Sequence, residues 1–122
     1  MARYVDGFVL PMPKKNVEAY RKIAAKAGKV WREHGALDYR ECVGDDLNVK
    51  GIFVSFPRQI KTKPGETVVF SWILYKSKAH RDAVNKKVMK DPRLAAMMSG
   101  EEQMPFDVKR MLYGGFKVIV EA

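Results

Sequence analysis

The feature that most constrains the fold of this chain is the run TVVFSWILY at residues 67–75, which leads directly into a segment with helical periodicity at residues 76–89. Apolar side chains occupy both the even and the odd positions of the run, so neither face of the predicted strand is polar. Such a strand is typical of the interior of a sheet that is covered on both sides. The following helix, with Ser77 as its N-cap, provides one cover. The other cover has to come from elsewhere.

Length and composition limit the possibilities further. The 122 residues are enough for one domain with one core, so we expect residues 1–122 to form a single domain. No apolar run approaches the roughly 20 residues that a membrane span requires, and we expect a cytoplasmic protein with no membrane partner. The single cysteine, Cys42, excludes a disulfide framework and a Cys-rich zinc site. We interpret Cys42 as a small apolar residue in a half-buried strand.

The formal net charge of +9 raises the question of nucleic-acid binding. Residues 14–34 and residues 76–93 each carry seven Lys or Arg against two acidic residues. Most of these charges lie opposite apolar stripes, and no aromatic platform or metal-finger spacing accompanies them. We therefore interpret them as solvated helix faces and predict no specific nucleic-acid partner.

The first half of the chain predicts a strand, a helix and a second strand. Residues 4–10 are apolar on both faces except for Asp6, which predicts another inner strand. Apolar residues then recur at three- and four-residue spacing up to His34, which predicts a helix capped by Asn16 and ended by Gly35. Residues 36–46 alternate between apolar and polar positions, as an edge strand does.

The second half begins with an insertion at residues 47–66, in which we expect a short strand or a turn of helix. After the central strand and helix, Asp91 and Pro92 predict the start of a short helix that ends at residue 98. Residues 99–107 are expected to form a loop. The last strand, at residues 109–121, contains Gly114 and Gly115, which indicate a bulge or a close backbone approach.

The order strand, helix, strand, strand, helix, strand predicts an α+β fold of the ferredoxin-like, split βαβ (βαββαβ) type with a four-stranded antiparallel sheet. Its inner strands are the first and the third, which are the two strands read as apolar on both faces. Helices on one face of the sheet leave aromatic and aliphatic side chains on the other. Pairing of two helix-free sheet faces in a homodimer would bury them.

Several motifs resemble those of a known family. They are YVDGFVLP (4–11), AGKVWREHGAL (27–37), YRECVGDD (39–46), VFSW (69–72), YKSKAHRD (75–82), VMKDPR (88–93), MPFDVKRM (104–111) and YGGF (113–116). Together they resemble the DUF1428 family of small bacterial proteins of unknown function. The resemblance implies a dimeric α/β barrel, a superfamily that also holds antibiotic-biosynthesis monooxygenases and haem-degrading enzymes. It implies no established activity.

Two residues are candidates for acid–base chemistry. Asp6 is a carboxylate in an apolar strand, so it needs a cationic partner or a raised pKa, and it is either a general base or one half of a salt bridge. His80 is expected near the start of a helix, in line with Val84 and Val88. A helix N-terminus disfavours the imidazolium form, so His80 is either a functional neutral imidazole or a locally hydrogen-bonded core residue.

Three further residues are candidates for ligand binding. Haem-degrading relatives of the superfamily line their cavity with an Asn, a Trp and a His, and Asp6, Trp72 and His80 fall on similar elements. Trp31 and His34 would border the same predicted cavity, although the helical stripe accounts for them fully, and Trp72 is better explained as a core residue. We predict no cofactor, and haem remains the remote alternative.

The acidic residues near the end of the second predicted strand and the methionines give little indication of a reaction. Glu41, Asp45 and Asp46 could attract a hard cation, but they lack the spacing of a calcium loop, so a solvated acidic turn is expected and no metal site is predicted. The seven methionines would make either an adaptable pocket lining or core filling.

The sequence therefore favours a protein that binds an apolar or aromatic small molecule between the sheet and the helices. If it is an enzyme, cofactor-independent oxygenation with Asp6 or His80 as the base is the expected class. The alternative is a non-catalytic accessory protein whose basic insertion at residues 47–66 contacts an acidic partner. Fold alone does not decide between them.

Overall fold

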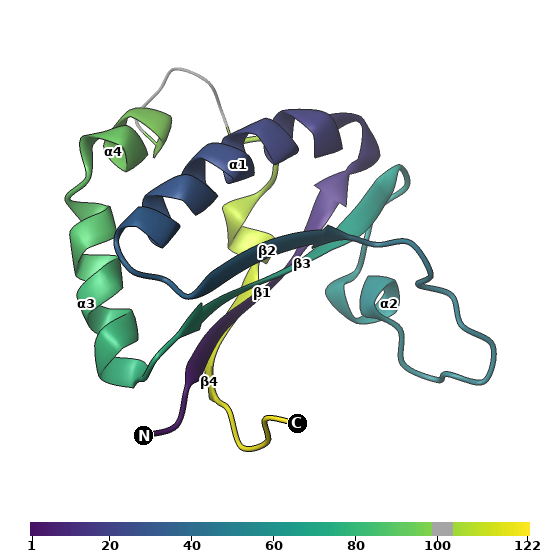
Figure 1. Cartoon of the computed structure of the whole chain (residues 1–122). Helices are drawn as coiled ribbons and strands as arrows, with labels where there is room; N and C mark the ends of the chain where they lie inside the picture. Colours follow the sequence, from purple (N-terminus) through teal and green to yellow (C-terminus); the bar gives the residue numbers. More distant parts are fainter. Residues whose placement is uncertain (99–103) are drawn as a thin grey trace.

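The computed structural model describes residues 1–98 and 104–122 and contains one sheet with helices packed against it (Figure 1). The sheet consists of β1 (Tyr4–Pro13), β2 (Asp38–Val43), β3 (Glu66–Tyr75) and β4 (Leu112–Lys117). Its strand order is β2-β3-β1-β4, and every neighbouring pair is antiparallel. This is the order of a split βαβ fold, so the predicted ferredoxin-like α+β class is confirmed, with the first and third strands inside.

One face of the sheet is covered by α1 (Val17–Glu33), α3 (Lys78–Met89) and α4 (Pro92–Met98) (Figure 1). The short helix α2 (Phe56–Ile60) lies against the opposite face, where the rings of Phe56 and Phe70 are 6.3 Å apart. The prediction of a helix-free second face is therefore wrong at one end of the sheet. The inserted segment contacts β1 and β3 there, and Pro11 and Val68 on this face are buried.

Helix α1 ends as predicted but begins differently. Gly35 follows the helix with φ +117°, a conformation that favours glycine. Asn16 precedes the helix but does not cap it with its side chain, because the 3-10 turn η1 (Lys14–Asn16) leads directly into α1. The Asn16 amide instead donates to the carbonyl of Pro105 at 2.8 Å and joins the start of α1 to the segment before β4.

The predicted caps of the two later helices are confirmed. The Ser77 hydroxyl accepts a hydrogen bond from the His80 backbone N–H at 3.1 Å at the start of α3. At the start of α4, the Asp91 carboxylate accepts from the Arg93 N–H at 2.9 Å, and Pro92 occupies the first helical position. These local signals fix where both helices begin.

The insertion and the C-terminal strand resolve the alternatives left open by the sequence. The insertion forms α2, capped by the Ser55 hydroxyl, which accepts from the Arg58 N–H at 3.3 Å. Before β4 lies the 3-10 turn η2 (Val108–Arg110), so the strand is shorter than predicted. Gly114 and Gly115 pair in regular register with Gly7 and Asp6, without a bulge. Of the predicted loop at residues 99–107, residues 99–103 lie outside the described chain, and residues 104–107 form no helix or strand.

The core lies between the sheet and the three covering helices. One cluster contains Val30, Ala36, Ile73, Tyr75, Val84, Val88 and Leu94, and a second contains Leu10, Met12 and Val69. On the opposite face, Phe70, Leu112 and Phe116 are 45–60% exposed. No helix in the described chain is long and apolar enough to cross a membrane.

Candidate functional site

A cavity of about 380 Å³ lies between the sheet and the covering helices and is lined by members of both core clusters. Its volume is within the range of roughly 300–1,000 Å³ that is usual for small-molecule sites. The sheet contributes helix-facing side chains of all four strands, and α1 contributes its apolar stripe. Most of the wall is apolar, and the principal members are Phe8, Leu10, Ile23, Ala27, Ile73, Leu94 and Phe106.

Methionine side chains form an adaptable part of this wall. Met89, Met97, Met104 and Met111 all line the cavity. Met98 belongs to α4, but its side chain lies outside what the structure describes. The sequence left open whether the methionines line a pocket or fill the core, and these four line the cavity. Methionine adapts its shape to the molecule it contacts, which suits a pocket for an apolar ligand.

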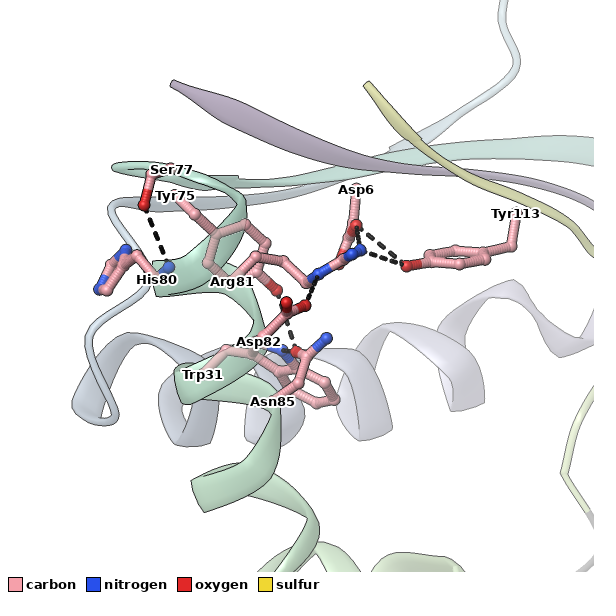
Figure 2. Close-up of polar contacts among 9 residues, drawn as sticks. All are labelled: Asp6, Trp31, Tyr75, Ser77, His80, Arg81, Asp82, Asn85 and Tyr113. Atoms are coloured by element: carbon pink, nitrogen blue, oxygen red, sulfur yellow. Dashed lines mark hydrogen bonds and ion pairs between the residues drawn. The ribbon is translucent and has the colours of Figure 1, made fainter. Parts of the chain in front are cut away.

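At one side of the cavity, Asp6 is held in a compact polar cluster (Figure 2). Its Oδ1 accepts from the Arg81 guanidinium at 2.7 Å and from the Tyr113 hydroxyl at 3.0 Å, and only 2% of Asp6 is exposed. Arg81 also donates to the Tyr113 oxygen at 2.8 Å and lies over the Tyr4 ring, 4.9 Å from its centroid. The charge of this buried carboxylate is thus compensated within the fold.

A second polar group belongs to α3. The Asn85 side-chain carbonyl accepts from the Trp31 indole and from the Tyr75 hydroxyl, both at 3.2 Å (Figure 2). Asn85 and Trp31 line the cavity, and Tyr75 is fully buried behind it. Burial raises the pKa of Tyr75 above its usual range, so the hydroxyl remains a donor. The group ties α1, β3 and α3 together around the cavity.

The third polar group lies on the β2 side. Glu41 accepts from the Tyr20 hydroxyl at 2.7 and 2.9 Å and from the Tyr39 hydroxyl at 3.1 Å. Burial raises the pKa of Glu41, and hydrogen bonds from the two tyrosines and Ser71 oppose that shift. The pKa values of Tyr20 and Tyr39 lie well above the usual range, chiefly because both hydroxyls are buried and secondly because the Glu41 charge is close. No ion pair involves Glu41 within residues 1–98 and 104–122.

The cavity belongs to a chain with close relatives. The family described as "Protein of unknown function (DUF1428)" matches residues 3–108. The chain belongs to the DUF1428 family. It is 48% identical over 119 residues to "Uncharacterized protein YbaA" of Escherichia coli (strain K12), covering 98% of each chain, and equally similar to the protein of that name in Shigella flexneri. Family membership, as the resemblance predicted, brings no assigned activity.

Two solved structures are similar to this DUF1428 chain in fold. A dimeric ferredoxin-like protein from an uncultured marine organism covers 100% of both chains, with a TM-score of 0.54 and 13% identity. A NIPSNAP domain protein from Burkholderia xenovorans covers 98% of this chain and 94% of its own, with a TM-score of 0.51 and 14% identity. At such low identity the similarity establishes the fold alone.

The structure brings only part of the predicted site to the cavity. Asp6 and Trp31 line it as expected. Trp72 also borders it, but its neighbours Ser71 and Ile73 face the helices, so strand alternation directs its indole to the opposite face. There its ring lies 6.1 Å from that of Phe70.

Both histidines lie outside the described lining of the cavity. The His80 ring lies on the other side of the first turn of α3 from Asp6 (Figure 2), and its Nδ1 accepts from the Lys76 N–H at 3.0 Å. Burial, with Lys76 and Lys87 nearby, lowers the pKa of His80. The His34 Nε2 lies 2.7 Å from Asp91 at the junction of α1 and α4. The environment of His80 is that of a locally hydrogen-bonded residue.

Neither haem nor a metal ion is supported by these residues. The described lining of the cavity contains no histidine, so these residues do not supply the imidazole that was expected for haem. In the described chain, no three His, Cys, Asp or Glu side chains are grouped to hold a metal ion. Cys42 is exposed rather than half-buried, because its side of β2 faces away from the helices.

Sequence reasoning missed Glu41, Arg81 and Tyr113. Glu41 was expected in a solvated acidic turn, but it lies in β2 and faces the helices together with Tyr39. The sequence did contain a signal for the buried position of Glu41: the residue lies on the apolar side of a strand in which apolar and polar positions alternate. Arg81 follows His80 in the first turn of α3 and pairs with the buried Asp6. The sequence did not predict this pair, because it depends on how α3 packs against the sheet.

Proposed function

We propose that this protein binds a small, largely apolar molecule in the cavity between its sheet and its helices. The observation that carries the proposal is the combination of a largely apolar wall with a few convergent polar groups. Aromatic and methionine side chains supply contact area, and Glu41 and Asn85 supply polar atoms that can orient a ligand. Members of both core clusters, among them Leu10 and Ile73, contribute to the wall of the cavity.

Catalysis gains little support from the geometry. Cofactor-independent oxygenation would need a base free to take a proton from the substrate. Asp6 is engaged by Arg81 and Tyr113, and His80 accepts a backbone hydrogen bond outside the described cavity lining. The proposal is therefore confined to binding.

We further propose that the binding protein is a homodimer in which the exposed sheet faces pair. Phe70, Leu112 and Phe116 would otherwise form an apolar surface in contact with water. A structural relative described as a dimeric ferredoxin-like protein shares the fold. In such a dimer the cavity of each subunit would lie on the side of the sheet away from the partner.

Calorimetric titration of the purified full-length protein with propylbenzene, an apolar aromatic probe, tests the binding proposal. Ala27→Phe adds a ring inside the cavity and is expected to abolish binding. Ala19→Phe makes the same change on an exposed part of α1 and is expected to leave binding intact. Absence of binding to the parent protein, or equal binding by the Ala27→Phe variant, would contradict the proposal.

A further inference from the structure

We infer that the cluster of Glu41, Tyr20 and Tyr39 binds the protonated amine of a ligand whose apolar body fills the cavity. This inference rests on the proposed binding function and names the chemical class of its ligand. The cluster joins α1 to β2, and all three residues line the cavity. The argument depends on hydrogen-bond polarity, charge and the aromatic surroundings of the cluster.

The cluster presents acceptors to an incoming ligand. Each tyrosine hydroxyl has one proton, and both protons point to the Glu41 carboxylate. What remains available is lone pairs on the phenol oxygens and on the carboxylate. A ligand that binds here must therefore bring a donor, such as an N–H or O–H group.

The charge of Glu41 favours a ligand with an ammonium group over one with a neutral hydroxyl group. The other cavity carboxylate, Asp6, is paired with Arg81 at 2.7 Å, whereas no ion pair of the described chain includes Glu41. Burial raises the pKa of Glu41, as expected for a carboxylate that lacks a compensating charge. A ligand cation would supply that charge.

The nearest arginines do not neutralise Glu41. Glu41 also lines a shallow groove at the outer edge between α1 and β2, together with Arg21, Lys29, Arg32 and Arg40. Lys29 forms no ion pair with Glu41 among the described residues. Arg21 pairs with Glu18, and Arg32 donates to the Ala36 carbonyl at 3.1 Å. Arg40 lies 3.3 Å from Asp38. The guanidinium groups at this edge are thus engaged with other acceptors.

Aromatic rings lie beside the Glu41 cluster. Tyr39 lies beside Trp31, with ring centroids 6.1 Å apart, and Tyr20 lies beside Phe106 at 5.5 Å. The negative faces of aromatic rings attract cations, and a carboxylate combined with such rings is suited to an alkylammonium group. The methionine-rich wall beyond them is suited to the apolar body.

Three probes of similar shape test the inference by calorimetric titration near neutral pH. They are 2-phenylethylamine, which is a cation; 2-phenylethanol, which is a neutral donor; and propylbenzene, which has no donor. We expect the amine to bind about tenfold or more tightly than the alcohol, the range expected for a charge-assisted hydrogen bond. Binding of propylbenzene with no preference for the amine would overturn the inference and leave the proposed function standing.

Glu41→Gln tests the residue assignment, because it removes the charge with little change in shape. This variant should lose the preference for the amine while still binding propylbenzene. Glu18→Gln removes the same charge from the exposed surface of α1 and should keep the preference. If Glu41→Gln fails to fold, Tyr20→Phe removes one acceptor and should lower the affinity ratio of amine to propylbenzene. An unchanged ratio in the folded variant would overturn the inference.

Discussion

Asp6 of β1 and Arg81 of α3 form an ion pair of 2.7 Å that joins the sheet to a covering helix, and only 2% and 13% of their side chains are exposed. Removing one partner of such a pair leaves a buried charge without compensation. We expect Arg81→Met to lower the free energy of unfolding by about 3–5 kcal/mol, measured by urea denaturation. The double variant Asp6→Asn, Arg81→Met should recover part of that loss. A loss near zero for Arg81→Met would contradict the role given to this pair.

A second prediction compares two adjacent glycines on opposite faces of β4. A methyl group at Gly115 would collide with the Tyr4 ring, whose Cε2 atom would be 2.8 Å away. At Gly114 it would meet only the exposed Phe116 ring at 3.3 Å, which can move. We expect Gly115→Ala to destabilise by about 1–3 kcal/mol, as overpacking does, and Gly114→Ala to cost clearly less. Equal melting temperatures for the two variants would show that the close approach of Tyr4 carries no cost.

The fold was predictable because its signals are local. Two-sided apolar strands, the Ser77 cap and the Asp91–Pro92 helix start each depend on residues close together in the chain. The order of these elements then leaves few topologies. Asn16 shows where local reasoning ends: its side chain bonds to Pro105, whose position only the tertiary structure determines.

The site was less predictable because it depends on register and helix rotation. Trp72 and Asp6 both border the cavity, as expected, but Asp6 pairs with Ile73, so the indole of the neighbouring Trp72 is directed to the opposite face of the sheet. His80 does lie in line with Val84, as predicted. However, His80 and Val84 pack against Gly35, at the end of α1, and neither belongs to the described lining of the cavity. The next residue, Arg81, is the one that reaches Asp6.

A pH-dependent prediction follows from the burial of Glu41. Its folded-state pKa is raised above the ordinary value of 4.5, so the protonated form is favoured by folding. The stabilising contribution is present below that ordinary value and is lost as pH rises through the folded-state pKa. Glu41→Gln cannot ionise, so its melting temperature relative to the parent should rise between about pH 4 and about pH 7. A constant difference across this range would contradict the raised pKa.

Titration of His80 should give the opposite dependence of stability on pH. Burial lowers its folded-state pKa below the ordinary value of 6.5, so folding favours the neutral ring. The stabilising contribution is present above that value and is lost as pH falls through the folded-state pKa. Protonation also removes the Nδ1 acceptor used by the Lys76 N–H. His80→Asn keeps an acceptor that does not titrate, so we expect a smaller loss of melting temperature than in the parent protein when the pH falls from about 7 to about 5. Identical losses would show that His80 does not titrate in this range.

The exposed sheet face yields a last prediction, about assembly. Phe70 lies on the inner strand β3 beside Trp72, where sheets that pair face to face would meet. Aromatic residues at the centre of an interface commonly contribute about 2 kcal/mol or more to association, so Phe70→Asp should shift a dimer toward monomer in sedimentation velocity measurements. Val108→Asp introduces the same charge at an exposed apolar residue in η2, outside the sheet, and should leave the dimer intact. A monomeric parent protein would contradict the proposed pairing. Dissociation by both variants would instead locate the interface elsewhere, because a sheet-face dimer has no reason to respond to a charge at Val108.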